Sequence, residues 1–206
     1  MAESSLKSRN LKYLAAVLAV DVIILSALDV KPTFDPFSGP LATVPATGLL
    51  TVIAALVLSW IVPPNLKHSL VHWRTRHVLP GHRAFSELAA KDSRIDIDAL
   101  RGLVGGELPT DPGQQDRVWF KLYKARDSEP AISETHQRVL FFRDAAAISL
   151  LLSLIELVIA LVCWNGPNAV AALVLLVQYL LFMVAGRHAG ERLVQSVMAS
   201  ASAGGK

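Results

Sequence analysis

The chain has 206 residues, of which 52% are hydrophobic and only 18% are charged, and its formal net charge is +3 at pH 7. A soluble globular domain usually carries about 25% charged residues, so the composition argues against a soluble globule and favours a membrane protein. The net positive charge lies mostly beside apolar runs, where anionic lipid headgroups attract lysine and arginine, and it gives little reason to expect a nucleic-acid partner.

Four apolar runs are long enough to cross a bilayer, which takes about 20 residues of helix. They comprise residues 13–30, 43–62, 145–164 and 169–186. One such run could be the buried helix of a soluble core, but four in a chain of this length predict an all-α integral membrane protein with four transmembrane helices. The segment between the second and third spans is expected to form a small helical cytoplasmic domain.

The first run needs a separate test, because Lys7, Arg9 and Lys12 precede it and a basic stretch before an apolar one also begins a secretory signal peptide. Asp21 interrupts the apolar stretch, and no clean small-residue cleavage site follows it. We therefore expect this run to be retained as a span.

The basic residues beside the spans predict the orientation of the chain, because cytoplasmic loops are enriched in lysine and arginine. These residues cluster before the first span, between the second and third spans, and after the fourth. The loop between the first and second spans and the loop between the third and fourth spans contain a single basic residue, Lys31. Both termini and the central segment are therefore expected in the cytoplasm. The predicted domains are two spans, a cytoplasmic helical domain, two further spans and a cytoplasmic tail, at residues 1–62, 63–143, 144–187 and 188–206.

Three polar residues, Asp21, Glu156 and Gln178, fall near the middle of three different predicted spans. The helical rise from the span ends places them at about the same depth, and a charged side chain on the lipid face costs at least about 2.5 kcal/mol. We therefore expect one intramembrane polar layer, with Thr51 as a further hydrogen-bonding partner. Either the acids are protonated packing residues, or they line a wet passage in an oligomer, where rings of carboxylates favour cations.

Two helices of the central segment have clear signals. Asp111 is a favourable N-cap with Pro112 at the first helical position, and it predicts a helix that continues to about residue 126. A second helix is expected to begin near Pro130, and no breaking residue separates it from the third span. A single rigid helix would then join the cytoplasmic domain to the membrane.

The stretch at residues 67–85 is rich in histidine and arginine. We interpret it as a juxtamembrane helix with Trp73 at the interface, followed by a turn at residues 80–81. His68 and His72 share a helical face, but no cysteine accompanies them and nearby arginines disfavour a divalent cation, so no metal or cofactor is expected. The candidates for binding lipid headgroups or an anionic ligand, such as a nucleotide messenger, are Lys67, Arg74, Arg76 and Arg83.

Catalytic signatures are missing from the chain, which has no nucleophile elbow, no phosphate-binding glycine loop and no zinc-protease motif. The single cysteine, Cys163, cannot form an internal disulfide. We therefore do not expect an enzyme.

The sequences RHVLPGHRAFSEL at residues 76–88 and WFKLYK at residues 119–124, together with the four-span layout, resemble small four-span bacterial inner-membrane proteins that accompany anti-phage defence genes. The resemblance covers most of the chain. It implies an effector or a sensor in the inner (plasma) membrane that perturbs the bilayer when infection is detected, and it assigns no functional residue.

Two functions follow as hypotheses. The first is a homo-oligomeric, channel-like effector whose cytoplasmic domain senses a partner or ligand and alters membrane permeability. The alternative is a non-conducting anchor or scaffold that recruits a cytoplasmic partner protein to the membrane.

Overall fold

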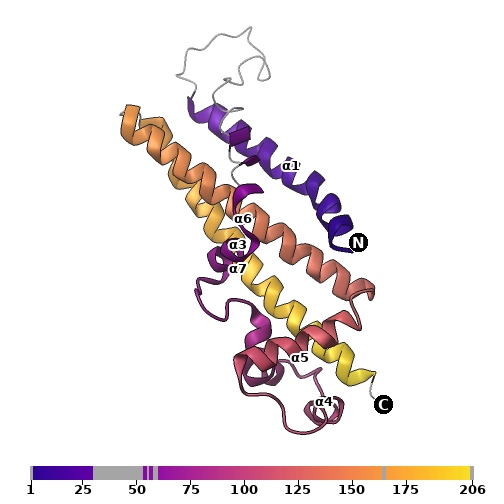
Figure 1. The fold of residues 1–206 in the computed structure, drawn as a ribbon. Coiled ribbons are helices and arrows are strands. Elements are labelled where there is room, and N and C mark those ends of the chain that lie inside the picture. Colours follow the sequence, from indigo (N-terminus) through magenta and orange to yellow (C-terminus); the bar gives the residue numbers. More distant parts are fainter. Residues whose placement is uncertain (1, 30–52, 55, 58–59, 164–165, 205–206) are drawn as a thin grey trace. The chain divides into compact units, whose positions relative to one another are not determined.

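A computed structural model describes residues 2–29, 53–54, 56–57, 60–163 and 166–204. Within these ranges every regular element is a helix and no strand occurs, which confirms the all-α prediction. In chain order the elements (Figure 1) are α1 (Ala2–Asp29), α3 (Pro64–His72), the short helical turns η1 (Pro80–Arg83), η2 (Ala84–Leu88) and η3 (Ala89–Lys91), and then α4 (Ile97–Val104), α5 (Pro112–Lys124), α6 (Pro130–Cys163) and α7 (Gly166–Ala203).

Two of the described helices are long and apolar enough to cross a membrane, over Pro130–Val162 in α6 and Asn168–Ala203 in α7. They contain most of the third and fourth predicted spans. The first predicted span is helical within α1, but the described part of α1 does not meet the same criterion, and the second lies largely outside the described residues. The described residues thus hold two candidate spans rather than the four predicted.

The long helix α6 confirms the predicted continuous helix, because it begins at Pro130 and runs unbroken to Cys163. Proline is favourable at the first helical position, where its missing N–H is not needed. No further proline and no glycine follows within the helix. Its 34 residues therefore form a rod about 51 Å long.

The last helix, α7, continues to Ala203, so most of the segment predicted as a cytoplasmic tail, residues 188–206, is helical. Apolar residues recur at helical spacing in this part, and Val197 and Met198 are completely buried. The small residues that follow suggest a frayed end in the sequence, yet Ala201 is buried in the same core. Small side chains here allow close packing of the helix and do not mark the end of the fold.

The chain divides into two compact units. The first unit contains Met1–Lys67 and Phe141–Met183, and the second contains His68–Leu140 and Val184–Lys206. In the first unit, α1, α6 and α7 pack through an apolar core that includes Leu18, Leu25, Ile148, Leu152, Ala171 and Leu175.

The second unit has a larger apolar core, to which η2, α4, α5, α6 and α7 contribute. Its members include Leu88, Leu100, Trp119, Ile132, Val197 and Met198. The helix α5 begins as predicted, because Asp111 Oδ2 accepts a hydrogen bond from the backbone N–H of Gln114 at 2.9 Å. Its end at Lys124 is two residues before the predicted end.

The segment between α3 and η1 departs from helical geometry. α3 ends at His72, because Trp73 has a left-handed backbone with a φ of 52°. The predicted proline–glycine turn is present as the start of η1. Gly81 packs so closely on Trp119 and on the carboxylate of Asp116 that a methyl group in its place would collide with both.

Candidate functional site

The first unit holds a polar group that links its three long helices. Gln178 on α7 donates hydrogen bonds from Nε2 to Asp21 Oδ1 on α1 at 2.9 Å and to Ser149 Oγ on α6 at 3.0 Å. Asp21 and Ser149 are both completely buried. Asp21 Oδ2 is also buried and makes no hydrogen bond to any described residue. The group therefore faces the interior of the first unit.

Glu156 belongs to a second polar group. Its Oε2 accepts a hydrogen bond from Asn168 Nδ2 at 2.6 Å, and only 4% of the residue is exposed. Ser149 and Glu156 are seven residues apart on α6, which corresponds to a rise of about 10 Å. The structure thus brings Gln178 to Asp21, as expected, but it divides the predicted single layer, because Glu156 lies about two turns further along α6. Thr51, also predicted for the layer, lies outside the described residues.

The sequence contains a signal for the polar face of α6. Ser149, Ser153 and Glu156 recur at intervals of four and three residues, which places them on one side of a helix. Ser153 Oγ donates a hydrogen bond to the backbone oxygen of Ala172 on α7 at 2.8 Å. Asn168, by contrast, precedes the fourth predicted span and carries no such signal.

Lys67 and the other predicted anion-binding residues belong to different units. Lys67 belongs to the first unit, where its Nζ pairs with Asp144 Oδ1 at 3.2 Å, and Arg143 Nη2 pairs with the same oxygen at 3.0 Å. Lys67 is buried in this ion pair and does not present its ammonium group to a headgroup. Arg74 and Arg76 are exposed residues of the second unit.

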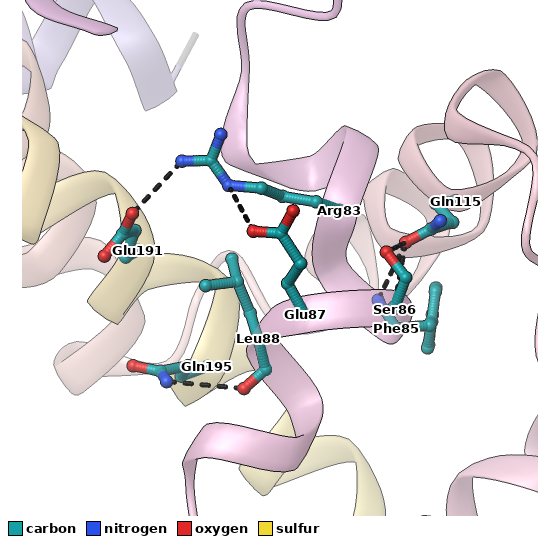
Figure 2. A network of polar contacts seen from close by, with 8 residues as sticks. All are labelled: Arg83, Phe85, Ser86, Glu87, Leu88, Gln115, Glu191 and Gln195. Atoms are coloured by element: carbon teal, nitrogen blue, oxygen red, sulfur yellow. Dashed lines mark hydrogen bonds and ion pairs between the residues drawn. The ribbon is translucent and has the colours of Figure 1, made fainter.

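Arg83 is buried in the second unit, within the polar network of Figure 2. Its Nη2 pairs with Glu191 Oε1 on α7 at 3.1 Å, and its Nε lies 3.6 Å from Glu87 Oε2. Arg83 therefore ties η1 to α7. The sequence could not reveal this pair, because its two members are separated by 108 positions.

Gln115 fixes the start of η2 in the same unit. Its Oε1 accepts hydrogen bonds from the backbone N–H groups of Phe85 at 3.0 Å and Ser86 at 3.1 Å. Gln195 Nε2 on α7 donates to the backbone oxygen of Leu88 at 3.4 Å. Figure 2 shows these side chains reaching the segment from its two sides, which holds it between α5 and α7.

His72 is a buried member of the second unit, with 5% exposure. A methyl group on Gly190 of α7 would lie 3.2 Å from His72 Cε1, so the imidazole packs directly on this glycine. Burial, together with the positive charge of its neighbours, lowers the pKa of His72 to about 4, so the side chain is neutral near pH 7. These neighbours are His68, Arg83, Arg187 and Arg74.

Metal-ligating side chains do not gather in groups of three or more anywhere in the described part of the chain. Comparisons with protein-family models, with curated proteins and with solved structures find no match for the chain. The features on which a function can be argued are therefore the buried polar groups of the first unit and the cationic residues around His72.

Proposed function

We propose that the first unit lies in a lipid bilayer and that the protein is a non-conducting anchor, whose second unit binds a cytoplasmic partner or ligand. The exposed side chains of α6 and α7 support this location in a bilayer. All the exposed large hydrophobic residues of these helices in the first unit could face acyl chains, and they are Leu154, Leu157, Val158, Leu161, Val162, Val170, Leu173, Val174, Leu176, Val177, Leu180 and Leu181.

The polar side chains of the same helices are turned inward. Ser149, Ser153 and Glu156 are buried, and the exposed residues of α6 and α7 in this unit are apolar throughout their described parts. A buried helix of a soluble protein can be equally long and apolar, but its exposed positions are usually polar. From Asn168 to Gly186 the helix rises about 27 Å, which is close to the thickness of a hydrocarbon layer of about 30 Å.

The burial of Asp21 favours the anchor function over the channel function. A ring of carboxylates around an oligomer axis requires acids that reach the surface of each chain, whereas Asp21 has 0% exposure and accepts its hydrogen bond from Gln178 of the same unit. Glu156 is likewise buried and bonded within the unit. Such polar contacts hold transmembrane helices together, and this packing role is the one that we assign to both acids.

The orientation and setting in this proposal come from the sequence. The even number of predicted spans and the basic flanks place both termini and the central segment in the cytoplasm. The resemblance to proteins beside anti-phage defence genes makes the inner membrane of a bacterium the proposed location and defence the proposed setting. A homo-oligomeric effector that conducts ions is the competing function.

Ion flux through proteoliposomes separates the two functions. We expect the full chain to resist alkaline extraction from membranes and to give no more potassium or proton flux than empty liposomes. The variants Asp21→Asn and Glu156→Gln should then leave flux at this background. The matched control is Ser93→Ala, which changes an exposed residue of the second unit. Extraction by alkali would overturn the bilayer assignment, and flux that disappears in either acid variant but not in the control would favour the channel.

A further inference from the structure

Three basic residues of the second unit carry buried nitrogen atoms that have no hydrogen-bond partner among the described residues. They are His72 Nδ1, Arg83 Nη1 and Arg187 Nε. Buried polar atoms in folded proteins nearly always have a partner. Three exceptions on two arginines and a histidine of one unit therefore call for a physical explanation.

The three residues meet on one stretch of α7. Gly190 and Glu191 follow Arg187 by three and four residues, so both lie on the same side of the helix as Arg187. His72 packs on Gly190, and Arg83 Nη2 pairs with Glu191 at 3.1 Å. Two elements that lie far from α7 in the sequence, α3 and η1, thus deliver His72 and Arg83 to the same part of α7.

The acidic residues of this region do not use all of the cationic donors. Glu191 engages Nη2 of Arg83 and Glu87 lies beside its Nε, which leaves Nη1 without a partner. Arg187 adds a second guanidinium, and the positive charges of Arg74 and Arg187 both act on His72. Positive charge therefore exceeds negative charge around the imidazole.

We propose that His72, Arg83 and Arg187 form a binding site for a phosphate group, carried either by an anionic lipid headgroup or by a soluble phosphorylated molecule. Phosphate suits the site because its several oxygens accept the hydrogen bonds that guanidinium groups offer. Arg187 is half-buried and Arg74 is exposed, so the site reaches solvent along these side chains.

The proposal goes beyond the anchor function and can fail separately from it, because binding is measured on the full chain in neutral detergent, without a bilayer. Inorganic phosphate is titrated into the protein, and calorimetry gives the affinity. We expect Arg187→Gln to weaken binding at least about tenfold, since it removes a charge-assisted hydrogen bond. The matched control, Arg192→Gln, removes the same charge from an exposed residue of the same helix and should bind as the wild type does.

A second readout does not depend on the folding of a variant. The ring resonances of His72 in the wild-type protein, assigned with His72→Gln, should shift when phosphate is added. The lipid source is tested by the same resonances in nanodiscs of phosphatidylcholine with and without phosphatidylglycerol. A shift with free phosphate or with phosphatidylglycerol supports the site and identifies its source. No shift in either experiment, or equal weakening by Arg187→Gln and Arg192→Gln, would overturn it.

Discussion

His72 couples the stability of the second unit to pH. Folding buries the imidazole among cations and lowers its pKa from 6.5 to about 4. Between these two values the unfolded chain binds a proton that the folded chain does not. The free energy of unfolding should therefore fall as the pH decreases from about 6.5 to about 4, by as much as about 3 kcal/mol.

The variant His72→Gln should lose this dependence. Glutamine does not titrate, so its free energy of unfolding should change less between pH 7 and about pH 4.5 than that of the wild type, measured by denaturant unfolding in detergent. His188→Gln removes an exposed histidine of the same unit and should keep the wild-type slope. Equal slopes in the wild type and His72→Gln would show that His72 is not the group responsible.

Single residues were predictable where their chemistry conflicts with their surroundings. Asp21 and Glu156 stand out because each interrupts an apolar run, and both are indeed buried and hydrogen-bonded. The partner of Asp21, Gln178, was predicted from its depth. Ser149, which also accepts a hydrogen bond from Gln178, and Asn168, which bonds Glu156, are ordinary polar residues that depth along a span does not select. Hydrogen bonding fixes the register of packed helices more finely than counting residues from a membrane surface, and this is why the predicted layer is divided.

At the scale of elements, two glycines in helices provide opposite tests of packing. Gly102 in α4 has no atom within 4 Å of the position that a methyl group would take. A methyl group on Gly190 in α7 would lie 3.2 Å from both His72 Cε1 and Pro80 Cγ. Alanine is favoured over glycine in a helix by about 1 kcal/mol, so only packing distinguishes the two sites.

We expect Gly102→Ala to raise the free energy of unfolding by about 0.5 to 1 kcal/mol. Gly190→Ala should lower it, because the proline ring is rigid and the buried imidazole has little room to move, and overpacking costs about 1 to 3 kcal/mol. Thermal or denaturant unfolding of the wild type and the two variants in one detergent measures both changes in the free energy of unfolding. Stabilisation by Gly190→Ala would show that the contact with α7 is looser than described.

Elements with local signals were predictable, and those that depend on distant packing were not. The capping aspartate and following proline fix the start of α5, and the lack of a breaker after Pro130 fixes the continuity of α6. The end of α7 has no local signal, because the small residues at positions 200–203 resemble a flexible tail. Its helical order comes from the core of the second unit, where Val197 and Ala201 are buried.

At the scale of the whole molecule, α6 and α7 each contribute to both compact units. Each of the two helices therefore supplies side chains to two separate apolar cores.

The proposed membrane topology makes the last prediction. The link between α6 and α7 should lie outside the cytoplasm, whereas residue 93 of the second unit should lie inside. The single native cysteine allows a clean comparison of Cys163→Ser/Asn165→Cys with Cys163→Ser/Ser93→Cys. In intact spheroplasts, a membrane-impermeant maleimide should label the first variant and should label the second only after lysis. Labelling of position 93 and not of position 165 in intact spheroplasts would show that the topology is inverted. Equal labelling of both before lysis, with a cytoplasmic marker protein protected, would contradict the single span, α6, that the proposed topology puts between them, because one crossing places the two sites on opposite sides of the membrane.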